Sequence, residues 1–324
     1  MLAGPEEKLQ GTQDLRTPNT PLMLAKDVVS ENRDPVSVPV CLHALLTNLI
    51  DYAGLFPPAG LGMSEAVANY ASYVAGEYAW ILGRFVLPAA RLEEFMQAQS
   101  AVKLRKPWRL SCLAGGEADL STVKHFYGQP GAQIDSIETK AETADQVTRL
   151  MADLPASPTA YFEVPLNCSA ELLSTIRQVG ARAKVRTGGL VPEAIPPSDA
   201  VAGFLTRCAS TRTPFKATAG LHHPVRCIRP LTYEAKAASA KMQGFLNVFL
   251  AAGLAYQGVP AEELTATLDL EDAQCFTFEN QMIRCPQGTL STDQIRAARE
   301  HFAVSFGSCS FEEPIRDLQT LRLL

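Results

Sequence analysis

The chain has 324 residues, a length that one large α/β domain can fill, and 47% of its residues are hydrophobic while 19% are charged. The net charge of −5 is small and of mixed sign, which argues against nucleic acid as a partner. The first 38 residues hold no apolar run long enough for a signal-peptide core, no run elsewhere reaches the length of a membrane span, and the eight cysteines form no CxxC pair. We therefore expect a cytoplasmic protein with no membrane partner and no structural zinc site.

The first predicted segment in chain order is a flexible arm over residues 1–38, which is rich in proline and charged residues. We expect one catalytic domain over 39–324. Leucines at helical spacing predict a lead-in helix near 42–50, and Ser64 begins a second helix that reaches about residue 77. The apolar stretch 80–87 then predicts the first strong strand.

Short apolar strands then alternate with longer amphipathic helices, the pattern of parallel strands joined by crossover helices. The expected strands are 109–113, 133–138, 160–165, 181–187 and 214–219, and the expected helices are 118–127, 143–153, 170–179 and 198–209. Beyond residue 230 the pattern changes to a long helix over 233–256, a hairpin over 275–284, a helix over 292–301, a closing strand over 302–306 and a polar tail helix. This order predicts an α/β fold, a (β/α)8 TIM-type barrel with an N-terminal arm and a C-terminal hairpin/helix insertion over 230–300.

Active sites of such barrels lie at the carboxyl ends of the strands. Lys184 and Arg186 are two apart in a strand and point to one face, and Thr187, Gly188 and Gly189 then let a ligand approach the backbone. Two cations on an inward face suggest an anionic group or carbonyl chemistry; a structural salt bridge to a strand-end glutamate is the alternative. The other polar residues at strand ends are Arg84, Glu138, Lys140, Glu163, Lys216, His222 and His223.

Lys216 lies in the otherwise uncharged run 213–220. Inside a barrel, burial and the nearby Lys184 would both lower the pKa of Lys216, which would make its amine nucleophilic enough to form a Schiff base. The alternative is a lysine that points outward between helices.

Three motifs carry a family resemblance: Lys-Val-Arg-Thr-Gly-Gly-Leu at 184–190, Phe-Lys-Ala-Thr-Ala-Gly at 215–220 and Phe-Gly-Ser-Cys-Ser at 306–310. Their order resembles the deoxyribose-phosphate aldolase type of class I aldolase. The resemblance implies a (β/α)8 barrel that needs no cofactor, with Lys184 as the Schiff-base lysine and Lys216 as its electrostatic partner. It further implies an anion-binding loop formed by Gly307, Ser308 and Ser310. The proton-transfer acid stays open among Asp135, Glu138 and Glu163, and the family pattern has no counterpart of His222 and His223.

The leading hypothesis is a carbon–carbon lyase that forms a Schiff base with a small anionic carbonyl or sugar-like substrate, in a chain that can form a homo-oligomer. Its catalytic candidates are Lys184, Lys216, His222, His223, Glu163 and Glu138, and its substrate-binding candidates are Arg84, Arg186, Thr187, Gly188, Gly189, Gly307, Ser308 and Ser310.

One alternative is a metal-dependent hydrolase or lyase in which His222 or His223 acts with a carboxylate; we expect only one of them to act, because neighbours in an extended segment point opposite ways. Another is a non-catalytic protein that binds small anions. Cys309 is a further candidate nucleophile. Asp51 and the segment 56–58 are expected either to cover the site or to fix an N-terminal loop.

Overall fold

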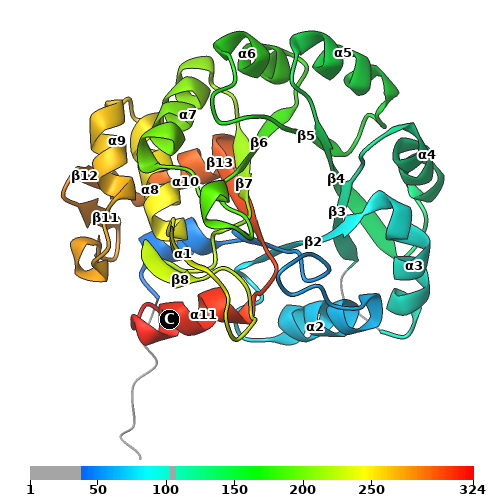
Figure 1. Cartoon of the computed structure of the whole chain (residues 1–324), viewed down its shortest axis with the longest axis horizontal. Helices are drawn as coiled ribbons and strands as arrows, with labels where there is room; N and C mark the ends of the chain where they lie inside the picture. Colours follow the sequence, from blue (N-terminus) through cyan, green and yellow to red (C-terminus); the bar gives the residue numbers. More distant parts are fainter. Residues whose placement is uncertain (1–37, 103–106) are drawn as a thin grey trace, which may run out of the picture. The chain divides into compact units, whose positions relative to one another are not determined.

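A computed structural model describes residues 38–102 and 107–324, so the predicted arm lies outside the described residues except for Val38. Eight parallel strands close into a barrel in the order β1-β13-β7-β6-β5-β4-β3-β2, which confirms the predicted (β/α)8 fold. Figure 1 looks into this ring of strands, with helices around it. The barrel strands are β1 (Ile50–Tyr52), β2 (Leu82–Pro88), β3 (Trp108–Leu113), β4 (Ala132–Lys140), β5 (Thr159–Glu163), β6 (Arg182–Arg186), β7 (Phe215–Thr218) and β13 (Ala303–Ser308).

The helices that follow the strands bury one apolar face against the barrel. Thr143 and Gln146 form a capping box at the start of α5, and Ser291 and Gln294 form another at the start of α10, which is why these helices begin where the sequence predicts. The helices are α1 (Val40–Leu46), α2 (Met63–Ala75), α3 (Leu92–Ser100), α4 (Glu117–Phe126), α5 (Ala144–Asp153), α6 (Ala170–Gln178), α7 (Ser198–Thr211), α8 (Phe245–Tyr256), α9 (Ala261–Leu268), α10 (Thr292–His301) and α11 (Glu312–Thr320).

The prediction of one helix over 42–50 is wrong at its end. The helix α1 stops at Leu46, and Asn48 adopts a left-handed backbone conformation with φ of 50° that a helix cannot continue through. Residues Ile50–Tyr52 instead form β1, which pairs with both β13 and β2 and so closes the barrel. This short strand brings Asp51 into the interior, where none of its surface is exposed.

The region 230–300 also differs from the prediction. In place of one helix over 233–256, the strands β8 (Cys227–Pro230) and β9 (Ser239–Met242) form an antiparallel hairpin, and α8 begins only at Phe245. The Asn247 side chain accepts a hydrogen bond from the backbone N–H of Arg226, which ties the start of α8 to the loop after β7. The predicted two-stranded hairpin has a third strand, giving β10 (Thr277–Phe278), β11 (Met282–Cys285) and β12 (Gly288–Ser291).

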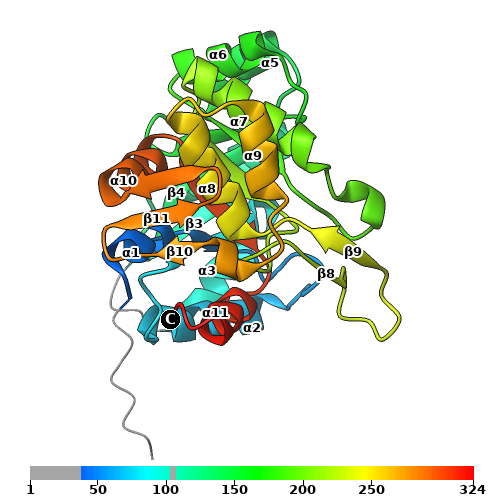
Figure 2. The same cartoon turned by 90° about the vertical axis from the view of Figure 1, so that its left-hand side faces the viewer.

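The hairpin β8–β9 follows β7 and therefore leaves from the carboxyl end of the barrel. In Figure 2 it lies on the opposite side of the view from α1, α10 and β11. All eight cysteines are free thiols. Among the described residues, no helix is both long enough and apolar enough to cross a membrane.

Candidate active site

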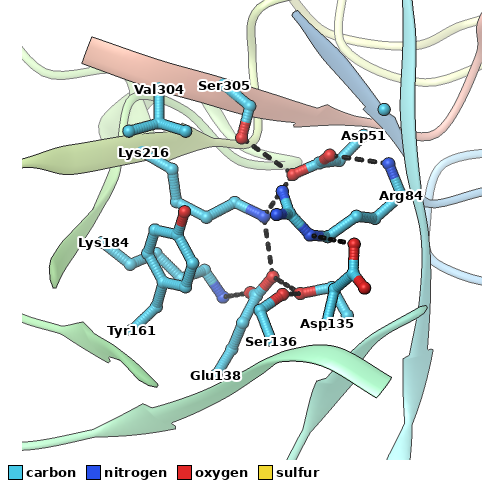
Figure 3. A network of polar contacts seen from close by, with 12 residues as sticks. Asp51, Arg84, Asp135, Ser136, Glu138, Tyr161, Lys184, Lys216, Val304 and Ser305 are labelled. Carbon is cyan, nitrogen blue, oxygen red and sulfur yellow. Dashed lines mark hydrogen bonds and ion pairs between the residues drawn. The ribbon is translucent and has the colours of Figure 1, made fainter. Parts of the chain in front are cut away.

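The interior of the barrel is charged where barrels of this type usually pack branched apolar side chains. Lys184 of β6 and Lys216 of β7 are partners in the strand register, so the two lysines stand side by side. Both are almost completely buried, at 4% and 1% exposure. Buried ammonium groups require close anionic partners, and Figure 3 shows the carboxylates that supply them.

Lys216 is held between two carboxylates. Its Nζ atom donates to Asp51 Oδ2 at 2.6 Å and to Glu138 Oε1 at 2.7 Å. Burial alone would lower the pKa of Lys216, but the charges of Asp51 and Glu138 outweigh burial and raise this pKa above its usual value. The expectation of a lowered Lys216 pKa is therefore wrong, because the two carboxylates override both burial and the neighbouring lysine.

Lys184 shares one of these carboxylates. Its Nζ atom lies 2.8 Å from Glu138 Oε2 and 2.9 Å from Glu163 Oε2. Glu138 thus bridges the two lysines with its two oxygens, and their charges hold the pKa of Glu138 well below its usual range despite its burial. Glu163 is the more accessible carboxylate, because 14% of its side chain is exposed against 3% for Glu138.

Hydroxyl groups fix the two buried carboxylates in place. Ser111 donates to Glu138 Oε1 at 2.6 Å and itself accepts a hydrogen bond from Ser136 at 2.7 Å. On the other side, Ser305 donates to Asp51 Oδ2 at 2.8 Å, and the backbone N–H of Arg84 donates to Asp51 Oδ1 at 2.8 Å. The lysine pair therefore rests in a frame from β1, β2, β3, β4 and β13 with little freedom to rearrange (Figure 3).

Arg84 and Asp135 lie away from the strand ends. The Nε atom of Arg109 donates to Asp135 Oδ2 at 2.7 Å, and that of Arg84 lies 3.5 Å from the same oxygen. Arg84 also lines a cavity at the amino ends of the strands together with Arg109 and Arg299. This position does not fit the predicted substrate-binding role of Arg84 at the carboxyl ends. It also removes Asp135 from the candidates for proton transfer near Lys184.

A cavity of about 220 Å³ opens above the lysines at the carboxyl ends of the strands. We call it the apolar cavity, because Phe56, Val86, Leu190, Leu231 and Met242 form much of its wall. The segment 56–58 thus covers part of the site, as one of the two expectations had it. The predicted site residues that line the cavity are Glu138, Lys184, Arg186, Gly189, Lys216, His222 and Gly307.

Other predicted binding residues have structural contacts instead. Thr187 is buried and donates a hydrogen bond to the backbone oxygen of Ala219 at 2.7 Å, which joins the loops after β6 and β7. Gly188 packs so closely on Gly220 that a Cβ atom on Gly188 would lie 2.7 Å from the Gly220 Cα. Neither residue is part of the cavity wall.

In the predicted anion-binding loop, the serine hydroxyl groups accept hydrogen bonds from backbone N–H groups of the same segment. Ser310 accepts a hydrogen bond from the backbone N–H of Glu313 at 3.1 Å, and Ser308 accepts one from the N–H of Ser310 at 3.4 Å. Ser308 is 2% exposed, and neither serine lines the apolar cavity. The first turn of α11 also carries Glu312 and Glu313, which disfavour a bound anion at that helix end.

The two histidines do not point opposite ways as expected, because their ring centroids lie 6.5 Å apart and both rings meet α11. His222 lines the apolar cavity and its Nδ1 atom lies 3.0 Å from Glu313 Oε2, whereas His223 lines another cavity and contacts Asp317 Oδ2 at 2.6 Å. Each histidine thus has one carboxylate partner on α11. Within residues 38–102 and 107–324, no three His, Cys, Asp or Glu side chains are grouped as a metal site requires. The metal-dependent alternative therefore has no supporting ligand set in this part of the chain.

Cys309 lines the apolar cavity, and its Sγ atom is 3.9 Å from the hydroxyl of Tyr233. Burial raises the pKa of the Cys309 thiol, which keeps it in the unreactive protonated form. This environment does not favour the role of a nucleophile.

A second cavity, of about 540 Å³, lies over the carboxyl ends of β3, β4 and β5. We call it the polar cavity, because its wall includes Glu117, Lys140, Gln146, Arg149 and Asp153. Lys184, Glu138 and Leu113 line both cavities. The side chain of Lys184 therefore stands where the two cavities meet.

Sequence reasoning missed four residues of the lysine frame, Asp51, Ser111, Ser136 and Ser305. The sequence predicts that Asp51 either covers the site or fixes an N-terminal loop, although an acidic residue between Ile50 and Tyr52 in a short apolar stretch is itself a sign of a buried partner. Ser111 and Ser305 lie inside apolar strands, where a small hydroxyl carries little signal because serine is tolerated at many positions.

Comparisons with known proteins concern the fold alone. No family model matches the sequence, and a search of curated proteins finds no match. Among solved structures, the chain is similar to a deoxyribose phosphate aldolase from Aeropyrum pernix that is described as having a unique tetrameric structure. The two share 12% sequence identity with a TM-score of 0.41, over 89% of this chain and 100% of that chain. A match at this level assigns no reaction to the chain.

Proposed function

We propose that this chain is a carbon–carbon lyase of the Schiff-base-forming, aldolase-like kind, acting on a small carbonyl compound through Lys184. The observation that carries the proposal is the buried pair of lysines that share Glu138, at a site that opens into two cavities. A lone buried lysine could be a structural ion pair. Lys216 is held between two buried carboxylates and lines one cavity, whereas Lys184 lines both, and this difference divides the roles that imine chemistry needs.

The two lysines differ in what holds them. Lys216 contacts Asp51, which has no exposed surface, and its raised pKa keeps it an ammonium ion at neutral pH. Lys184 contacts Glu163, whose side chain is partly open to the polar cavity and can take up the proton that Lys184 must lose before it attacks a carbonyl. We therefore assign the nucleophile to Lys184 and a fixed positive charge beside it to Lys216.

In the proposed reaction the neutral amine of Lys184 adds to the carbonyl carbon, and the carbonyl oxygen leaves as water after it has gained two protons. The resulting iminium accepts the electron pair of the carbon–carbon bond as that bond breaks, while the β-hydroxyl gives its proton to a base and becomes the carbonyl of the first product. Glu163 is the carboxylate placed to carry protons in these steps. Protonation of the enamine and hydrolysis then release the second product and restore Lys184.

Arg186 lines the apolar cavity. Its side chain is more exposed than those of the other ion-paired residues in the cavity wall. Its side chain is 56% exposed and its Nη1 atom lies 3.9 Å from Glu163 Oε1. This weak contact leaves Arg186 free to meet a polar group of the substrate as it enters. His222, whose ring is held by Glu313, lines the same cavity and can donate or accept a hydrogen bond there.

Borohydride trapping tests the proposal. The protein is treated with sodium borohydride and a panel of small aldehydes and ketones, and intact-protein mass spectrometry measures the added mass. We expect a reduced adduct on the wild type that Lys184→Met abolishes and that Lys241→Met, a change to a surface lysine, leaves unchanged. Equal labelling of the wild type and Lys184→Met would overturn the assignment.

A further inference from the structure

We propose that the cavity at the amino ends of the strands, opposite the lysine site, binds a small organic phosphate. This cavity has a volume of about 650 Å³, and we call it the arginine cavity because Arg84, Arg109, Arg296 and Arg299 line it. It shares no lining residue with the two cavities over the lysines. Its ligand is therefore not the substrate of the proposed reaction, and the inference does not depend on the proposed function.

One carboxylate serves the two arginines that come from the strands. Asp135 Oδ2 lies 2.7 Å from Nε of Arg109 on β3 and 3.5 Å from Nε of Arg84 on β2. Among the described residues, the Arg84 side chain donates no hydrogen bond, and Arg109 donates only from Nε. Asp51 accepts from the Arg84 backbone N–H but is bound to Lys216. Because only 15% of the Arg84 side chain is exposed, its unused N–H groups call for an acceptor in the cavity.

Helix α10 supplies the other two arginines, three positions apart and so on one face of the helix. The N–H groups of Arg299 donate to backbone oxygens of the segment 45–47 and of the start of β13, which fixes this guanidinium in place. Its partners among the described residues are thus neutral, and desolvation lowers the pKa of Arg299 to about 10. Arg296 contacts Asp293 at 3.2 Å, but both side chains are exposed, so this pair is weak. Glu300, the acidic residue in the wall, is 74% exposed.

The directions from which the arginines come favour a phosphate group over a carboxylate. Guanidinium groups reach the cavity from β2, β3 and α10, and the oxygens of a tetrahedral phosphate can accept hydrogen bonds from several directions at once. A carboxylate accepts mainly in one plane. The wall also includes apolar side chains that a carbon skeleton can contact, namely Val38, Val40, Ala44 and Val304. The volume lies in the range of sites for small organic molecules.

Isothermal titration calorimetry of the whole chain with sorbitol 6-phosphate and glycerol 2-phosphate tests the inference. Neither compound has a carbonyl group, so neither can react with Lys184. Sorbitol and citrate at the same ionic strength are the comparison ligands, and we expect no binding of sorbitol and weaker binding of citrate. Arg296→Gln should weaken binding of the phosphates about tenfold, and Arg109→Gln/Arg296→Gln should weaken it further, because charge-assisted hydrogen bonds are lost. The matched control Arg91→Gln/Arg284→Gln removes two ion-paired arginines outside the cavity wall and should leave the affinity unchanged.

Four results would each overturn the inference. They are no binding of either phosphate, an affinity that Arg109→Gln/Arg296→Gln leaves unchanged, citrate or sorbitol binding as tightly as the phosphates, and a loss of binding in Arg186→Gln alone. The last would place the phosphate at the lysine site. Arg296→Gln leaves the contact of Arg109 with Asp135 intact, so it reports on the cavity even where the double variant is unstable. Borohydride trapping at Lys184 tests the proposed function separately, because these ligands form no imine.

Discussion

Removal of the Lys216 ammonium is expected to destabilise the protein strongly. In Lys216→Met the side-chain volume is nearly kept, but Asp51 and Glu138 remain buried with their common cationic partner gone. Removing one partner of a buried ion pair costs about 3–5 kcal/mol of unfolding free energy. Lys241→Met is the matched control: Lys241 contacts Glu271 at the same 2.6 Å, but both side chains are exposed, at 41% and 51%. This exposed pair should contribute less than about 1 kcal/mol.

The loss in Lys216→Met should depend on pH in a defined direction. Without Lys216, burial and mutual repulsion raise the pKa values of Asp51 and Glu138, although Glu138 keeps Lys184 as a partner, so protonation in acid offsets part of the loss. Urea unfolding followed by circular dichroism at pH 7 and at pH 5 measures both effects, and the difference between variant and wild type should be smaller at pH 5. A loss below about 1 kcal/mol, or a loss that is the same at both pH values, would refute the account of this network.

Three further outcomes are expected. The wild type should lose stability below about pH 4, because the pKa values of Asp51 and Glu138 are lowered on folding and their stabilisation disappears as these carboxylates protonate; melting temperatures that stay level from pH 4 to pH 2 would contradict this. Gly220→Ala (φ +76°) should cost more in urea unfolding than Gly258→Ala (φ +87°), because only at Gly220 would the new Cβ meet neighbouring backbone, at 2.8 Å; equal losses would be inconsistent with that packing. Cys309 should react slowly with iodoacetamide at pH 7, and Cys309→Ser should keep borohydride trapping at Lys184, whereas loss of trapping would point to a chemical role for the thiol.

The barrel and the lysine pair could be predicted from sequence because both are local signals. Short apolar strands alternate with amphipathic helices, and Lys184 and Lys216 each lie in a strand that is followed by a glycine-containing segment. Neighbouring parallel strands then place the two lysines side by side without further information.

The ionisation of the site could not be predicted in the same way. The partner that raises the Lys216 pKa is Asp51, which is 165 positions away in a strand of only three residues. The helix predicted over 233–256 failed for a similar reason. Its first half is rich in alanine and lysine, but Cys227–Pro230 pairs with Ser239–Met242 as a hairpin, and long-range pairing outweighs local helix preference.

The measurement that tests the central claim most directly is peptide mapping of the borohydride-reduced protein after incubation with a small aldehyde. The account predicts a secondary amine on Lys184, with Lys216 unmodified because its ammonium stays bound between Asp51 and Glu138. An adduct on Lys216 in place of Lys184, or one found only on exposed lysines, would contradict it.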